Sequence, residues 1–168
     1  MTAFKIDASF LGELMQIKNI NSVISVSEQI TIVDIGEIAS SGFKSIICNR
    51  PDGEGPDQPT FAEVESAAKS AGLVIAHQPV ISGKVSDEDA LEFGALIDRL
   101  PKPILAYCRT GTRSATLWSL SEGARGRQLS EILAATKSAG YDMSGVVRRI
   151  ANGGRTPTDV ADARHDIV

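Results

Sequence analysis

The sequence predicts a three-layer α/β domain with a mostly parallel sheet flanked by helices. Apolar runs of strand length alternate with amphipathic runs of helix length, and this order requires parallel strands joined by helical crossovers. Three predicted strands have uninterrupted apolar cores, as strands buried on both faces should: Ile46-Ile47, Val74-Ile75 and Ile104-Leu105-Ala106. A length of 168 residues corresponds to about one domain.

The first elements differ in how clearly they are marked. Residues 1–19 carry a mixed apolar pattern, compatible with a short strand followed by a helix. Residues 22–27 alternate and are rich in β-branched side chains, so they predict a strand. We expect Thr31 to cap a helix that ends at Gly42. The short apolar run 44–48 predicts the next strand.

A loop rich in proline and glycine, residues 49–59, follows this strand. Thr60 and Glu63 have the spacing of a capping box, which predicts a helix that ends at Gly72. Residues 73–77 form the next predicted strand. The order strand, helix, strand is therefore maintained through the middle of the chain.

The second half continues the alternation. Ser86 is expected to cap a helix whose acidic first turn suits the helix dipole. Pro101 and Pro103 end that helix and lead into a strand over 104–107, and a further helical pattern starts at about Arg113. The remaining predicted features are a break at Gly123 and Gly126 and two helices, over 129–140 and 144–153.

Composition excludes several classes of protein. Lys and Arg number 17 against 21 Asp and Glu, and the net charge of -4 argues against a nucleic-acid binder. No apolar stretch reaches the roughly 20 residues of a membrane span. Two cysteines are too few for a secreted disulfide scaffold, and the N-terminus lacks a signal-peptide pattern, so we expect a reducing, cytoplasmic location.

The stretch from Ile104 to Leu120 carries the clearest chemical signal. A strand ends at Cys108, a polar turn with one glycine follows, and a helix begins. This geometry aims backbone N–H groups at one point, here the cysteine sulfur. Those groups, together with Arg109 and Arg113, favour the thiolate form, which predicts that Cys108 is a nucleophile rather than a buried packing residue.

Three loops should share one edge of the sheet, because sites in such folds lie beyond the carboxyl ends of the strands. The loops are 49–59, 78–86 and 108–113. The rule brings Arg50 and Asp52 to the site, where they either contact the substrate or pair with each other in a solvated turn.

At these residues the chain resembles known families. The segment Cys108-Arg-Thr-Gly-Thr-Arg113 resembles the active-site loop of rhodanese sulfurtransferases, whereas the order of elements is similar to that of dual-specificity phosphatases. More specific is a resemblance to the "beta-lactamase hydrolase-like protein, phosphatase-like domain" family, also labelled sulfur transferase. It covers roughly residues 17–123 and rests on Cys108–Ser114 together with Val26-Ser-Glu-Gln29, Asn49-Arg-Pro-Asp-Gly-Glu54 and Gln78-Pro-Val80.

The family's two labels imply two reactions. Phosphatase loops have five residues between cysteine and arginine, whereas Cys108 and Arg113 enclose four. A shorter loop should hold a persulfide or thiosulfate more readily than a phosphoryl group, so the main prediction is a sulfurtransferase. In it Cys108 takes sulfane sulfur as a persulfide and passes it to cyanide or a thiol acceptor. The loop residues Thr110, Gly111 and Thr112 and the side chain of Arg109 would bind the substrate anion.

The alternative is a phosphatase that forms a phosphocysteine and therefore needs a general acid. Asp87 and Asp89 follow a Ser-Gly-Lys loop and are candidates for it, as is Asp52, although the first two are also typical helix N-terminal charges. Ser114 matches the hydroxyl position with which phosphatases help the thiolate to leave. A third possibility is a non-catalytic module that binds an anion in the loop.

Other residues carry weaker signals. Cys48 is read as a packing residue that could form a regulatory disulfide with Cys108 only if their α-carbons lie within about 7 Å. His77 and His165 are too few and too far apart for a metal site, and no cofactor is predicted.

The end of the chain suggests a neighbouring domain. We expect a single domain over 1–154 and a polar linker over 155–168. The last five residues, Arg164-His-Asp-Ile-Val168, resemble the opening strand of flavin-dependent oxidoreductases such as sulfide:quinone oxidoreductase. Domains of the family are fused to sulfide-oxidising enzymes, which makes such a flavoprotein the expected partner.

Overall fold

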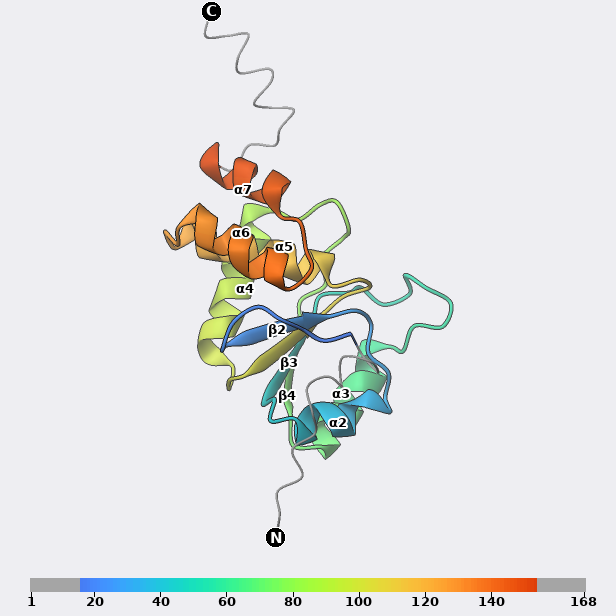
Figure 1. Ribbon diagram of the computed structural model, residues 1–168. Helices are drawn as coiled ribbons and strands as arrows, with labels where there is room; N and C mark the ends of the chain where they lie inside the picture. The colour runs from blue at the N-terminus through green and yellow to red at the C-terminus, as the bar shows by residue number, and fades with distance from the viewer. Residues whose placement is uncertain (1–15, 154–168) are drawn as a thin grey trace, which may run out of the picture.

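A five-stranded sheet forms the centre of the protein, in a computed structural model that describes residues 16–153. Its strand order is β1-β2-β5-β3-β4, and every pairing is parallel except that of β1 with β2. The strands are β1 (Lys18–Asn19), β2 (Ile24–Ser27), β3 (Ser45–Cys48), β4 (Val74–His77) and β5 (Ile104–Tyr107). The predicted fold class, a mostly parallel sheet with helices on both faces, is confirmed (Figure 1).

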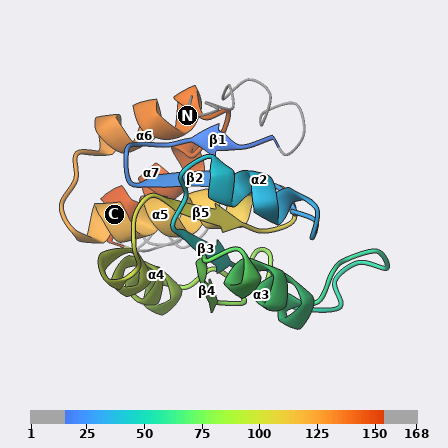
Figure 2. The ribbon, with the colours of Figure 1, turned by 90° about the horizontal axis from the view of Figure 1, so that it is seen from below.

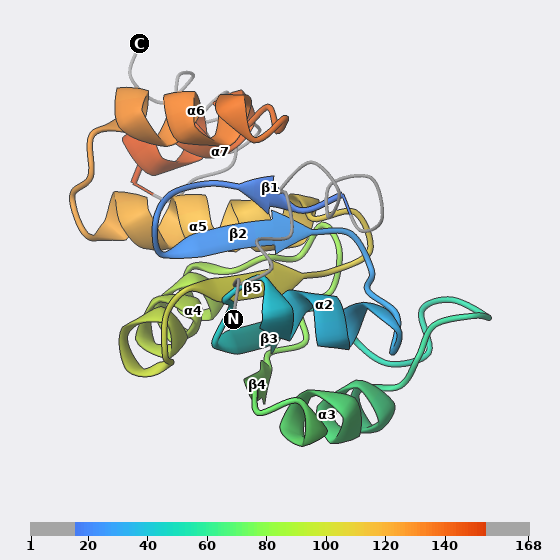
Figure 3. The ribbon, with the colours of Figure 1, turned by 60° about the horizontal axis from the view of Figure 1, so that its bottom comes forward.

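Residues 16–153 form six helices around the sheet: α2 (Asp34–Ser40), α3 (Phe61–Ser70), α4 (Asp87–Arg99), α5 (Thr112–Ala124), α6 (Leu129–Ser138) and α7 (Ser144–Ala151). Figures 2 and 3 show α2 and α3 on one face and α4 and α5 on the other, with α6 and α7 beyond α5. Side chains of β5 alternate between the two cores accordingly: Ile104 and Ala106 pack in the core of α4 and α5, and Leu105 and Tyr107 in that of α2 and α3.

The local signals for helix starts were mostly reliable. Both predicted capping positions accept the expected N–H, since Thr60 caps α3 through Glu63 and Ser86 caps α4 through Asp89. The prediction for Thr31 was wrong: Val33 occupies the N-cap of α2, and the Asp34 carboxylate accepts the Thr31 N–H at 2.7 Å. The Asp34 N–H donates to the Thr31 carbonyl at 3.1 Å and not to the threonine hydroxyl, so a turn precedes the helix, which begins later.

Two further sequence predictions need correction. Gly123 does not break the central helix, which continues to Ala124; this glycine is instead where Ile150 of α7 packs, and a Cβ would lie 2.7 Å from that side chain. Strand β4 is not buried on both faces, because it is the last strand of the sheet and Val74 is 44% exposed. The patterns predicted for residues 1–15 and 154–168 lie outside the part of the chain that the structure describes.

Candidate active site

The sulfur of Cys108 lies at the carboxyl end of β5, the strand at the middle of the sheet. Cys108 follows the last residue of β5 and is 1% exposed, and α5 begins four residues later at Thr112. The Gly111 N–H donates to Cys108 Sγ at 3.1 Å. The predicted strand, loop and helix are therefore present, and the loop directs a backbone donor at the sulfur, as a thiolate nucleophile requires.

Gly111 is the position where the loop tolerates no other residue. Its φ is +91°, and an added Cβ would collide with the hydroxyl of Tyr141 and lie 3.3 Å from the Ser27 carbonyl. Tyr141 Oη also donates to the Thr110 carbonyl at 3.2 Å. Burial raises the pKa of Tyr141 to about 12, so this phenol keeps its proton and remains a donor at neutral pH.

The guanidinium of Arg113 is bound by protein groups at its two terminal nitrogens, and the edge formed by Nε and Nη2 remains open. Its Nη1 and Nη2 donate to the two carboxylate oxygens of Glu54, each at 2.9 Å, and Nη1 also donates to the Val80 carbonyl at 2.9 Å. The Arg113 side chain is 8% exposed. Within residues 16–153, nothing accepts from Nε or from the second N–H of Nη2, so these two donors can bind an oxyanion side by side.

Glu54 joins two arginines of different loops. Besides Arg113, it accepts from Arg50 Nε at 3.0 Å, and Arg50 Nη1 donates to Gln29 at 3.0 Å. The hydrogen bond from Arg113, with a further one from Arg50, lowers the pKa of Glu54, so this carboxyl is ionised at neutral pH. Its negative charge compensates the burial of both guanidinium groups.

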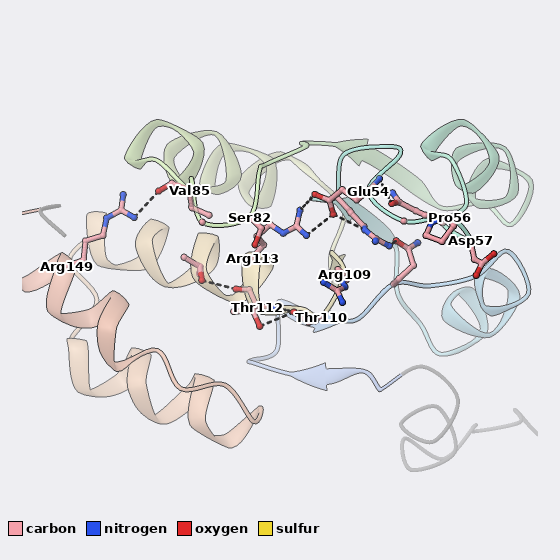
Figure 4. A pocket seen from close by; sticks show the side chains of 16 residues that line it. Glu54, Pro56, Asp57, Ser82, Val85, Arg109, Thr110, Thr112, Arg113 and Arg149 are labelled. Carbon is pink, nitrogen blue, oxygen red and sulfur yellow. Dashed lines mark hydrogen bonds and ion pairs between the residues drawn. The ribbon is translucent and has the colours of Figure 1, made fainter. Parts of the chain in front are cut away.

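A cleft of about 1200 Å³ opens in front of Arg113. The three loops predicted to share an edge all line it, which confirms that part of the sequence analysis, and α7 adds one residue, Arg149 (Figure 4). The predicted substrate-binding residues Arg50, Arg109, Thr110 and Thr112 all line the cleft. Four arginines face two carboxylates, those of Glu54 and Asp57, so the cleft is positive although the chain carries a net charge of -4.

The three predicted candidates for a general acid are all engaged elsewhere, and none lines the cleft. Asp52 accepts the Phe61 N–H at 2.8 Å and Asp89 the Ser86 N–H at 2.9 Å. Asp87 pairs with Arg149 at 2.8 Å. These carboxylates therefore act as helix-capping or ion-pair groups in this structure.

Ser114, Cys48 and His77 lie around the active-site loop without a direct contact to the sulfur of Cys108 among their hydrogen bonds. Ser114 is buried, and its hydroxyl donates to the Asn49 side chain at 2.8 Å rather than to the sulfur. Cys48 and Cys108 are both free thiols. His77 stacks on Phe61 with ring centroids 4.2 Å apart, and its Nε2 lies 3.1 Å from the Arg50 carbonyl oxygen, so it supports the loop that carries Arg50.

Two classes of feature are not found in residues 16–153. No group of three or more histidine, cysteine, aspartate or glutamate side chains there is arranged to hold a metal ion. None of the helices described there has both the length and the apolar character needed to cross a bilayer.

Sequence reasoning missed three residues that shape the site: Glu54, Tyr141 and Arg149. Glu54 lies 59 residues from Arg113 in the chain, and Tyr141 lies 31 from Thr110. The only available signal was that Glu54 belongs to a segment resembling the family's motif. A carboxylate and an arginine that distant are paired by the fold, so no local pattern reveals the contact.

The role of Glu54 leads to a prediction on stability. Glu54→Gln should lower the free energy of unfolding at pH 7 by about 2 kcal/mol, because two buried arginines lose a charged partner. The folded-state pKa of Glu54 is depressed, so its stabilisation is complete above the unfolded value of roughly 4.3 and is lost as the pH falls through the folded value. The difference from wild type in urea unfolding should therefore be smaller at pH 4 than at pH 7.

Glu65→Gln provides the matched control. Glu65 pairs with Lys69 at 3.5 Å on α3, and both side chains are more than one-third exposed. Its loss should cost less than about 0.5 kcal/mol. If both substitutions lowered the free energy of unfolding equally, the buried ion pair between Glu54 and Arg113 would not be stabilising as argued.

The fold and this site define a class: a cysteine-dependent enzyme of the phosphatase-like fold. The sequence profile for "Beta-lactamase hydrolase-like protein, phosphatase-like domain" matches residues 16–125. The chain therefore belongs to that family, as the sequence motifs indicated.

Similar proteins support this assignment. The chain is 36% identical over 135 residues to the beta-lactamase hydrolase-like protein of Agrobacterium fabrum and 34% identical over 134 residues to that of Xylella fastidiosa. These alignments cover 80% and 79% of the chain, which spans only 31% of the length of each of these curated relatives.

Solved structures agree on the fold. A candidate phosphatase of Neisseria meningitidis is 37% identical with a TM-score of 0.75, and the match covers 84% of this chain and 99% of that one. Tk-PTP in its active form has a TM-score of 0.64 at 22% identity, covering 82% and 95% of the two chains, and shows the fold alone. The comparisons favour the phosphatase interpretation over the sulfurtransferase that the short loop had led us to expect.

Proposed function

We propose that the protein is a cysteine-dependent phosphatase that acts on phosphate monoesters. The observation that carries the proposal is the open edge of Arg113, with Nε and one Nη2 hydrogen directed away from Glu54 and Val80. Two parallel N–H donors fit two oxygens of a phosphoryl group. The Gly111 N–H donates to Cys108 Sγ at 3.1 Å in the same loop, which supports Cys108 as the nucleophile.

The reaction proceeds in two steps. The Cys108 thiolate forms a bond to phosphorus while the bond from phosphorus to the ester oxygen breaks, and the ester oxygen leaves as an anion that takes its proton from solvent water. Water then attacks the phosphocysteine, releasing inorganic phosphate and restoring the thiolate. Arg113 holds the two oxygens throughout both steps and stabilises the charge that builds on them.

The source of the proton limits the range of substrates. Of the two cleft carboxylates, Glu54 is kept ionised by its arginines, and the side chain of Asp57 makes no hydrogen bond or ion pair within residues 16–153 that would position it as an acid. A site without a well-placed acid favours esters whose leaving group departs as a stable anion. Of two esters that bind equally well, the one with the more acidic leaving group, such as an aryl phosphate, should therefore react faster.

Sulfur transfer is a second candidate, favoured by the four-residue spacing between Cys108 and Arg113. Attack on the outer sulfur of thiosulfate releases sulfite, so the transfer needs no acid, and a thiol acceptor would remove the sulfur. A fused or associated sulfide-oxidising flavoprotein would suit this reaction as a partner.

One experiment distinguishes the candidates. The protein is incubated with p-nitrophenyl phosphate or with thiosulfate, and release of p-nitrophenol and the intact mass after rapid acid quench are recorded. A phosphatase releases nitrophenol and gains a phosphoryl group, whereas a sulfurtransferase gains a sulfur atom from thiosulfate. Absence of both would overturn both candidates and leave an anion-binding module.

A further inference from the structure

Three of the four cleft arginines are already held by protein groups. Arg113 is bound by Glu54 and Val80, and Arg50 by Glu54 and Gln29. Arg149 Nη1 donates to the Val85 carbonyl at 2.9 Å, and its Nη2 donates to Asp87. The hydrogen bonds and ion pairs of these three arginines therefore mainly hold the walls of the cleft together.

Arg109 differs from the other three. It is exposed, it lines the cleft, and its side chain has no hydrogen-bond or ion-pair partner among residues 16–153 (Figure 4). Its position is fixed at the backbone, where the Arg109 carbonyl accepts the Gln29 N–H at 3.2 Å. The residue therefore presents an uncommitted guanidinium to the cleft.

The cleft offers little to an aromatic substrate. Among its lining residues in the described range there is no Phe, Tyr, Trp or His, and the apolar side chains are those of Pro56 and Val85. Thr110, Thr112 and Ser82 add hydroxyl groups instead. The ring of a phosphotyrosine would find no stacking partner here, whereas a hydroxylated or ionic substrate would find donors.

We infer that the substrate is a small, polar phosphate ester with a second anionic group, and that Arg109 binds this second group while Arg113 binds the phosphate. The inference rests on the proposed function for the phosphate end only. A cleft of about 1200 Å³ exceeds the size of a phosphate several-fold, so it has room for such a molecule. Asp57 is the cleft carboxylate without an ion-pair partner in the described chain. Its negative charge would repel a second anionic group, so binding of that group requires the positive charge of Arg109.

The test compares two molecules of one skeleton, glycerol 3-phosphate and 3-phosphoglycerate, which differ in a hydroxymethyl group against a carboxylate. Calorimetry on Cys108→Ser protein gives their affinities without turnover. We expect 3-phosphoglycerate to bind about tenfold more tightly. Arg109→Gln in the same background should remove that preference, reducing the affinity ratio to near one.

Arg99→Gln is the control, since it makes the same charge change on an exposed part of α4 outside the cleft. It should leave the ratio unchanged. A ratio near one in the parent protein, or one that persists in Arg109→Gln, overturns the inference even if p-nitrophenyl phosphate is hydrolysed. A ratio that depends on Arg109 in a protein without any phosphatase activity overturns the proposed function and supports the second-anion site.

Discussion

Cys108→Ser is expected to lower kcat/KM for p-nitrophenyl phosphate by at least a factor of about 10³. The reacting species is a thiolate, and a serine hydroxyl in the same loop stays protonated although the Gly111 N–H still points at it. The side chains are similar in size and Cys108 is 1% exposed, so the circular dichroism spectrum should not change. Stopped assays at several enzyme concentrations would measure the residual rate.

Cys48→Ser is the control for this substitution. Cys48 ends β3, next to β5 in the sheet, and burial raises its pKa, so it remains a neutral thiol. Its Sγ donates to the Arg50 carbonyl at 3.4 Å, a bond that a serine hydroxyl can replace. If the Cys48 variant were inactive and the Cys108 variant active, the nucleophile would have been assigned to the wrong strand.

Arg113→Lys should cost a factor of about 10² to 10³ in kcat/KM, mostly through kcat. The guanidinium has five N–H donors, and three of them satisfy Glu54 and Val80 while two face the substrate. Ammonium has three donors on a single atom and cannot hold the carboxylate and an oxyanion in the same geometry. Steady-state kinetics would separate the effects on kcat and KM.

Arg125→Lys is the control that shows whether an arginine-to-lysine substitution outside the cleft also lowers kcat/KM. Arg125 follows α5 and makes a bidentate pair with Asp98, but both side chains are more than 40% exposed. Its replacement should change kcat/KM less than twofold. An Arg113→Lys enzyme within threefold of wild type would show that another group binds the phosphoryl oxygens.

Much of the fold could be predicted because its signals are local. Apolar runs marked the strands, and the spacing of Thr60 with Glu63 marked a helix start. The site loop was predictable for the same reason, since Cys108, Gly111 and Arg113 lie within one turn of chain. The prediction at Thr31 was wrong because the Asp34 N–H donates to the Thr31 carbonyl rather than to its hydroxyl, which forms a turn before the helix.

The parts of the site that could not be predicted depend on distant contacts. Asp87 was a reasonable candidate for an acid until the fold placed Arg149 beside it, 62 residues further along the chain. Likewise, Arg113 pairs with Glu54 only because the fold brings the 49–59 loop against the 108–113 loop. Loop length alone cannot decide between phosphate and sulfur chemistry, because the number of residues does not reveal which arginine donors face the cleft; the comparisons favour the phosphatase alternative.

The contact between Glu54 and Arg113 bears on the rate at which a substrate can bind. The guanidinium lies in its working position before any substrate arrives, so the loss of side-chain entropy is part of folding and does not weaken association. A phosphoryl group bound as proposed would meet a guanidinium that Glu54 and the Val80 carbonyl already hold. For such a substrate the side chain of Arg113 would add no rearrangement of its own to capture, and the positive charge of the cleft would steer the anion towards it.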